Sequence, residues 1–180
     1  MEKNLTHIAL FAALIAVLGL IPKIDLVSGV PITAQSLGIM LCGTVLGAKR
    51  GALAVVLFLA LVAAGLPLLS GGRGGIGVFA TPSVGYLVGF PVAAFVAGTV
   101  VEKWRAPILG AAFAGAFVGG IVVLYAFGIP GMAVVLGKSL PEAALLATPF
   151  LAGDLIKCAL AALITRTVSQ MRPGALLSRA

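Results

Sequence analysis

Residues 148–168 read Thr-Pro-Phe-Leu-Ala-Gly-Asp-Leu-Ile-Lys-Cys-Ala-Leu-Ala-Ala-Leu-Ile-Thr-Arg-Thr-Val, and this stretch decides the fold class. Its length suits a transmembrane helix, which needs about 20 apolar residues. Its interior nevertheless carries Asp154 and Lys157. Charged side chains inside a membrane are costly and usually face a bundle interior or a wet cavity. The stretch therefore predicts a membrane helix with a polar face turned towards neighbouring helices.

The composition of the whole chain agrees with this interpretation. The 180 residues are 61% hydrophobic and 9% charged, with a mean hydropathy of +1.22. Soluble domains carry about 45–50% apolar and about 25% charged residues. So few charges cannot cover a water-soluble surface, and the composition excludes a soluble, a disordered or a collagen-like protein.

Apolar runs broken by charges, proline and glycine predict six transmembrane helices in an all-α membrane protein with a single domain, residues 1–180. The predicted spans are Leu5–Ile21, Ile32–Leu46, Ala52–Leu69, Val84–Val101, Ile108–Phe127 and Thr148–Val168. Pro22 and Lys23 follow the first span where a signal peptide would carry small residues, so no cleavable signal is expected. No clear internal repeat supports an inverted-repeat transporter.

Basic residues predict the orientation of these spans, because they collect in cytoplasmic loops. One face of the predicted topology carries eight, namely Lys3, Lys49, Arg50, Lys103, Arg105, Arg166, Arg172 and Arg179. The other face carries three, namely Lys23, Arg73 and Lys138. Both termini are therefore expected in the cytoplasm of a multi-pass protein of the inner or plasma membrane.

Asp154 and Lys157 are spaced i, i+3 and share a helix face. Counted from Thr148, they lie ~9 Å and ~14 Å into the membrane, within reach of a pocket that opens outward. A carboxylate accepts hydrogen bonds and an ammonium donates them, so the two suit a ligand with N–H donors beside an acceptor. The alternative is an ion pair that neutralises itself and binds nothing.

A glycine-rich stretch follows the third predicted span on the expected outer side. It reads Leu69-Ser-Gly-Gly-Arg73-Gly-Gly-Ile-Gly-Val-Phe-Ala-Thr-Pro-Ser-Val-Gly-Tyr86. The Arg73 fork is suited to a carboxylate, so the stretch could close over an anionic ligand. Alternatively, the glycine-rich stretch is a flexible loop that closes over nothing. Tyr86 is equally compatible with ordinary packing in the fourth predicted span.

The sequence lacks the residues that metal sites, catalytic triads and nucleotide-binding sites require. Cys42 and Cys158 form no C-x-x-C pair, and the single histidine, His7, cannot build a metal centre or a Ser-His-Asp triad. The Gly72–Gly77 match to G-x-G-x-x-G and the P-loop-like Gly131–Ser139 lack the required context or spacing. We therefore expect neither an enzyme, nor a metal site, nor a cofactor, nor nucleic-acid binding.

The first span carries two small-residue pairs, Ala9/Ala13 and Ala12/Ala16. Small residues allow close contacts between helices in lipid, so either pair can meet another subunit, including a second copy of this chain. Alternatively, these alanines contact no other subunit and are present only because alanine is a common residue.

Six segments, in order along nearly the whole chain, resemble the BioY family, the substrate-binding (S) components of energy-coupling factor (ECF) biotin transporters. They are Pro31–Gly38, Lys49–Ala52, Ala64–Pro67, Gly71–Gly75, Gly85–Pro91 and Gly153–Lys157. The family usually has Gly-Pro-Thr-Gly-Gly-Tyr before the fourth span, whereas this chain has Thr81-Pro-Ser-Val-Gly-Tyr86. Ser83 keeps a hydroxyl there, but Val84 replaces a glycine, which changes the local shape of the pocket.

The resemblance implies a six-helix subunit that captures biotin from outside and works with a transmembrane coupling subunit and cytoplasmic ATPases. It implies that Asp154 binds the ureido N–H groups, that Lys157 binds the ureido carbonyl or the carboxylate, and that Arg73 binds the carboxylate. Tyr86, Ser83, Gln35 and Thr33 are the further candidates for substrate binding. The small-residue face of the first span would contact the coupling subunit, in either register.

Two other functions remain open at this stage. The same architecture could bind another vitamin, such as thiamine or riboflavin. A small channel or structural membrane subunit would bind no ligand tightly and would tolerate loss of Asp154.

Overall fold

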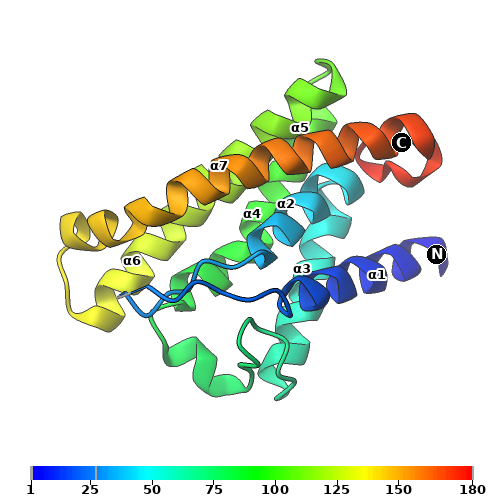
Figure 1. Cartoon of the computed structure of the whole chain (residues 1–180). Helices are drawn as coiled ribbons and strands as arrows, with labels where there is room; N and C mark the ends of the chain where they lie inside the picture. The colour runs from blue at the N-terminus through cyan, green and yellow to red at the C-terminus, as the bar shows by residue number, and fades with distance from the viewer. Residues whose placement is uncertain (1, 27, 180) are drawn as a thin grey trace.

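The computed structural model describes residues 2–26 and 28–179, with side chains from residue 4 onward (Figure 1). Helices dominate these ranges, and two isolated β-bridges, Ile24 with Ile32 and Leu69 with Arg73, are the only extended pairings they contain. The long helices are α1 (Glu2–Leu18), α2 (Gln35–Leu46), α3 (Ala48–Ala63), α4 (Val84–Lys103), α5 (Ile108–Phe117), α6 (Leu124–Leu136) and α7 (Leu140–Met171). Short helical segments are η1 (Ile76–Ala80), η2 (Val118–Val123), η3 (Pro173–Ala175) and η4 (Leu177–Arg179).

Three continuous helical segments are long and apolar enough to cross a membrane: Val84–Lys103, Ile108–Leu136 and Leu140–Met171. Among the others, α1 and α2 are shorter apolar helices. The all-helical prediction is thus confirmed for the described residues, and the chain has the long apolar helices of a membrane protein.

Three predicted spans extend beyond the helices that form. The second begins at Ile32, whereas α2 begins at Gln35. The first helix ends at Leu18 rather than Ile21, because Gly19 packs closely against the carbonyl of Leu68. The third ends at Ala63 rather than Leu69, because Gly65, with a φ of 106°, and Pro67 break the helix before Leu69 joins a turn.

Two other predicted spans are too short. The fifth continues past Phe127 to Leu136, through a π-helical segment, η2, and across Pro130, until left-handed Gly137 ends it. The sixth begins at Leu140 rather than Thr148, because Ser139 and Glu142 form a capping box and Pro141 occupies the first turn. Pro130 and Pro149 lie inside α6 and α7, where neighbouring helices can accommodate a proline.

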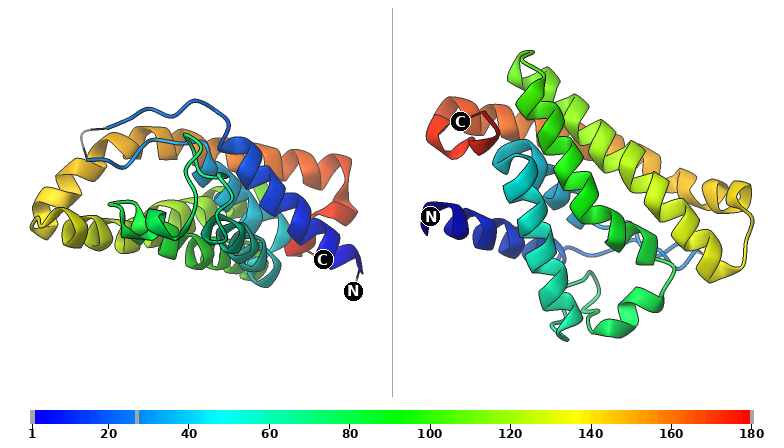
Figure 2. Two further views of the ribbon diagram at one scale, coloured as in Figure 1. Left: turned by 90° about the horizontal axis from the view of Figure 1, so that it is seen from below. Right: turned by 180° about the vertical axis from the view of Figure 1, so that it is seen from behind.

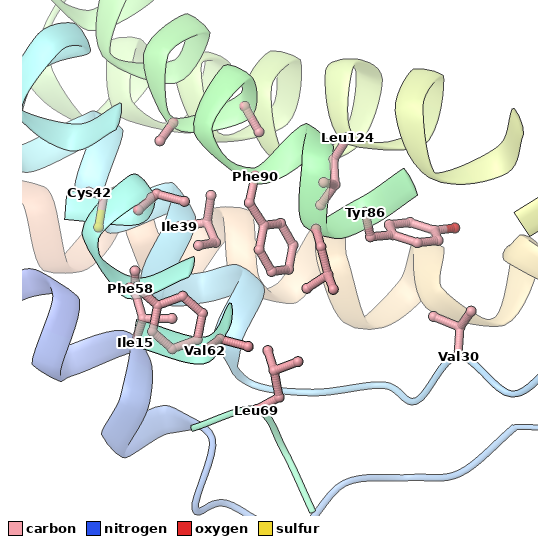
Figure 3. Close-up of a cluster of buried hydrophobic side chains, with 14 of the residues drawn as sticks. Ile15, Val30, Ile39, Cys42, Phe58, Val62, Leu69, Tyr86, Phe90 and Leu124 are labelled. Atoms are coloured by element: carbon pink, nitrogen blue, oxygen red, sulfur yellow. The ribbon is translucent and has the colours of Figure 1, made fainter. Parts of the chain in front are cut away.

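Helix α4 lies at the centre of the bundle and contacts α2, α3, α5, η2 and α6 (Figure 2). Its contact with α6 depends on Gly85, where an added Cβ would lie 2.2 Å from the carbonyl oxygen of Phe127. The buried core between these helices includes Ile15, Phe58 and Phe90 (Figure 3). Close helix contacts at small residues are the expected means of association in lipid.

Both ends of the chain lie at the same end of the bundle (Figure 1). After α7 the chain folds back, so that Ser178 donates to the carbonyl of Thr44 at 2.6 Å. Arg179 donates to the carbonyls of Trp104 and Ala106, next to the end of α4. The tail therefore joins α7 to α2 and to the loop between α4 and α5. The side chain of Lys3, counted in the predicted orientation, lies outside the described residues.

Candidate functional site

The polar side chains singled out in the sequence gather around one pocket between α2, α4, α6 and α7. We call this cavity the polar pocket. Two extended segments, before α2 and after α3, complete its wall. It is lined by Val30, Pro31, Ile32, Thr33, Gln35, Ser36, Leu69, Arg73, Ser83, Tyr86, Leu87, Phe90, Leu124, Phe150, Asp154 and Lys157.

Asp154 is the centre of a hydrogen-bonded network in this pocket. Its Oδ1 accepts from Lys157 Nζ at 2.9 Å, and its Oδ2 accepts from the Tyr125 hydroxyl at 2.9 Å. Ser36 Oγ accepts from Lys157 Nζ at 2.9 Å and donates to Asp154 at 3.4 Å. The network links α2, α6 and α7, so a buried carboxylate is held in one orientation with charge-assisted bonds.

Aromatic rings form one side of the polar pocket. The Tyr86 ring meets Tyr125 edge-on at 6.3 Å and Phe150 at a tilt at 6.0 Å. Among the residues that the structure describes, the hydroxyls of Tyr86 and Ser83 are buried and have no hydrogen-bond partner. Buried polar groups are normally paired, and an unpaired one is costly. These two hydroxyls are therefore available to a polar ligand.

The glycine-rich stretch is folded rather than loose. Leu69 and Arg73 exchange backbone hydrogen bonds at 2.9 and 3.2 Å across a tight turn. Gly71 and Gly72 form the turn with φ values of 80° and 69°, which side chains rarely adopt. Arg73 Nε donates to the Ser70 carbonyl at 3.3 Å, and the side chain lines the pocket.

Gln35 lines the pocket but uses its amide to hold the backbone around it. Its Nε2 donates to the carbonyls of Ile15 and Leu68 at 3.1 and 3.0 Å, and its Oε1 accepts from Ser70 N at 3.1 Å. An amide has two donor hydrogens, and both are engaged. Gln35 thus ties the end of α1 to the glycine-rich turn. Thr33 accepts from the Gln35 backbone N–H at 3.3 Å.

The charges and size of the pocket limit what it can bind. Arg73, Lys157 and Asp154 are its charged lining residues, which leaves one net positive charge for an anionic ligand. The cavity measures about 70 Å³. Pockets that hold drug-sized ligands measure roughly 300 Å³ or more, so this cavity is small for a vitamin-sized ligand.

Comparison with known proteins identifies the family. The BioY family model matches residues 2–174. This chain belongs to the BioY family.

Two curated relatives and one solved structure extend this result over nearly the whole chain. The "Biotin transporter BioY" of Rhodobacter capsulatus is 52% identical, over 99% of this chain and 100% of that protein. The "Probable biotin transporter BioY" of Bacillus subtilis is 41% identical, over 93% and 90% of the two chains. A crystal structure of the S-component for biotin from an ECF-type ABC transporter superposes with a TM-score of 0.88 at 31% identity, covering 94% of this chain and 92% of that one.

The polar pocket of this BioY family member also contains residues that sequence reasoning missed. Tyr125 and Ser36 both bond Asp154 or Lys157, and Phe150 supplies part of the aromatic wall. One signal for Tyr125 was available, since it is one of two tyrosines in the chain and lies in an apolar run. Ser36 and Phe150 look ordinary in the sequence, because only the packing of α2 against α7 brings them to the site.

The two alanine pairs of α1 face different ways in this BioY family member. Ala12 is buried and Ala16 packs against the core, whereas Ala9 and Ala13 are exposed. The structure therefore distinguishes two registers that the sequence left open. Only Ala9/Ala13 is free for contact with another subunit.

Proposed function

We propose that this protein is the biotin-binding membrane component of an ECF-type uptake system, which captures biotin at the outer face. Uptake is driven by a separate energising module, and the chain itself performs no chemical catalysis. The single observation that carries the proposal is the Asp154 network, which holds a buried carboxylate and ammonium beside two unpaired hydroxyls in one pocket.

We assign the ligand contacts from the chemistry of each group. Asp154 accepts from the ureido N–H groups of biotin, because a carboxylate offers only acceptors. Lys157 donates to the ureido carbonyl, since it lies next to Asp154. Arg73, on the glycine-rich turn, binds the valerate carboxylate. Tyr86, Ser83 and Thr33 complete the polar contacts, and Gln35 positions the turn.

We infer that the whole chain forms one domain of six crossings in the inner or plasma membrane, with both termini in the cytoplasm. Helix α2 has 12 residues, about 18 Å of helix, against the ~30 Å of a bilayer core. The extended segment at residues 28–34 completes its crossing. Non-helical backbone is tolerated at such depth where it lines a cavity, and this segment lines the polar pocket.

The energising partners are a transmembrane coupling subunit and a pair of cytoplasmic ATPases. This assignment is supported by the likeness to a solved S-component of an ECF-type transporter. The exposed pair Ala9/Ala13 on α1 is the contact we assign to the coupling subunit, because small residues permit close approach in lipid.

Biotin binding to detergent-purified protein tests the function, with thiamine and riboflavin as competing ligands. We expect tight biotin binding by the wild type, and a loss of about 30-fold or more (~2 kcal/mol) in Asp154→Ala, which leaves buried donors unpaired. Asp25→Ala is the matched control, since Asp25 is an exposed carboxylate paired with Lys23 outside the pocket. Folded protein that prefers thiamine or riboflavin, or binds none of the three, contradicts the proposal. Unchanged affinity in Asp154→Ala removes Asp154 from the site.

A further inference from the structure

A second cavity lies at the opposite end of α4 from the polar pocket, where α2 turns into α3. We call it the basic cavity. It measures about 470 Å³ and is lined by Leu46, Ala48, Lys49, Arg50, Phe95, Thr99, Glu102 and Lys103. Its size falls in the range of cavities that hold small molecules.

The positive charge of this cavity is not cancelled within the protein. Residues 4–26 and 28–179 contain two ion pairs, Lys23–Asp25 and Lys157–Asp154, and neither involves a residue of the basic cavity. Arg50 donates one bond, to the Leu177 carbonyl at 3.4 Å, and keeps its other donors. Lys49, Arg50 and Lys103 therefore present three cationic groups.

The one carboxylate among the lining residues is already engaged. Glu102 Oε1 accepts from the Ala48 N–H at 2.8 Å, at the first turn of α3. Gly47, with a φ of 86°, makes room for it, because a Cβ there would lie 2.3 Å from Glu102 Oε1. A carboxylate at a helix N-terminus is balanced by the helix dipole. The carboxylate is therefore directed at the backbone of α3.

A tryptophan beside the cavity indicates that this end of the bundle lies near the lipid head groups. Trp104, the single tryptophan, directly follows Lys103 and is 52% exposed. Exposed tryptophan marks the membrane–water interface. One wall of the cavity is apolar, because Phe95 of α4 is 44% exposed there. A ligand seated there meets cations at one end and an apolar side chain at the other.

We propose that the basic cavity binds the phosphate of an anionic phospholipid head group, held by Lys49, Arg50 and Lys103, with the acyl-glycerol end against the exposed ring of Phe95. Basic pockets between membrane helices are suited to such head groups. A free phosphate ion would gain nothing from the apolar wall. The site is independent of biotin binding, because it lies at the other end of the bundle.

Lipid retention measured by native mass spectrometry tests the proposal, using purified protein in micelles with equimolar phosphatidylglycerol and phosphatidylcholine. We expect selective retention of phosphatidylglycerol by the wild type. We expect a loss of about 30-fold in the double variant Lys49→Gln/Lys103→Gln, since each charge near the surface contributes about fivefold. The matched control is Arg166→Gln/Arg172→Gln, which removes two exposed charges from the same end of α7 but outside the cavity.

The outcomes separate the proposal from its rivals. Unchanged biotin affinity in both double variants shows that they are folded. Equal lipid loss in the control variant, or no loss in the cavity variant, overturns the proposal. Displacement of the lipid by millimolar inorganic phosphate or glycerol phosphate identifies a free-phosphate site instead. Loss of coupling-subunit binding with unchanged lipid retention identifies a protein contact, which also overturns it.

Discussion

At the scale of single residues, the two tyrosines of the polar pocket differ in how their hydroxyls are used. The Tyr125 hydroxyl donates to Asp154 at 2.9 Å, whereas the buried Tyr86 hydroxyl has no partner within residues 2–26 and 28–179. A hydrogen bond to a charged group contributes about 1.5–3 kcal/mol, but a buried unpaired group is a cost. The same Tyr→Phe change should therefore act oppositely at the two positions.

We predict that Tyr125→Phe lowers the melting temperature of the ligand-free protein and weakens biotin binding about tenfold, because Asp154 loses a bond that orients it. Tyr86→Phe should leave the ligand-free melting temperature unchanged or raise it, and should weaken biotin binding. Thermal unfolding with and without biotin measures both effects. A fall in ligand-free stability for Tyr86→Phe would show that its hydroxyl is paired in the protein.

At the scale of elements, Gln35 connects three segments that are far apart in the sequence. Its amide joins Ile15 of α1 to Leu68 and Ser70 of the turn that carries Arg73. We predict that Gln35→Leu weakens biotin binding about tenfold and accelerates hydrogen exchange at the Ser70 amide, because Ser70 loses its acceptor. Hydrogen exchange and biotin titration of the same variant measure the two effects.

A double-mutant cycle distinguishes this positioning role from a direct ligand contact. If Gln35 acts through the turn, the effects of Gln35→Leu and Arg73→Ala on biotin affinity should not add. In Gln35→Leu the turn no longer positions Arg73, so removing the Arg73 side chain as well should cost little more. Additive effects would show that Gln35 acts independently of Arg73. Asp25→Ala serves as the control, since Asp25 is exposed and lies outside the pocket.

The packing of α4 on α6 gives a second prediction at this scale. Gly85→Ala should destabilise the protein by about 1–3 kcal/mol, because the new methyl group would lie 2.2 Å from the Phe127 carbonyl. It should also weaken biotin binding, since Tyr86 is the next residue.

Gly110→Ala is the matched control, because Gly110 in α5 has no heavy atom within 4 Å of an added Cβ. The control should be neutral or stabilising, since alanine is the better helix former. Equal melting temperatures for the two variants would contradict the close contact.

At the scale of the whole molecule, charge and the positions of the loops set the expected orientation. The first turn of α3, the end of α4 with the loop after it, and the C-terminal tail meet at one end of the bundle. They carry Lys49, Arg50, Lys103, Arg105 and Arg179. The loop between α6 and α7, with Lys138, lies at the other end (Figure 1). By the positive-inside rule, we expect the first end to face the cytoplasm.

Cysteine labelling of intact cells tests this orientation. Cys42 and Cys158 are both fully buried, so the native chain should give little background. We predict that Lys138→Cys reacts with an impermeant maleimide from outside, and that Arg105→Cys reacts only after the membrane is opened. Both positions are exposed, so reactivity reports the side of the membrane. The reverse pattern, or labelling of both from one side, would refute the proposed six-span topology.

The sequence alone determined the class of the protein, because composition is a property of the chain before it folds. Its apolar runs predicted the helices, and the cost of burying Asp154 and Lys157 marked them as candidates for the site. Local sequence signals did not predict correctly where several of the helices begin and end. The fifth and sixth predicted spans stop short of residues that are helical in the structure, and Pro130 and Pro149 lie inside the helices because neighbouring helices accommodate them.

Only the tertiary structure decided which side chains act together. Ser36 and Tyr125 lie 118 and 29 residues from Asp154, and no local pattern predicts that they bond it. Gln35 was expected to bind ligand, yet its amide binds backbone from α1 and the glycine-rich turn. The two alanine pairs of α1 are equivalent in the sequence, and only packing buries Ala12 and leaves Ala9 exposed. The chemical character of each side chain follows from the sequence alone. Which side chains bond each other depends on contacts between helices that are distant in the sequence.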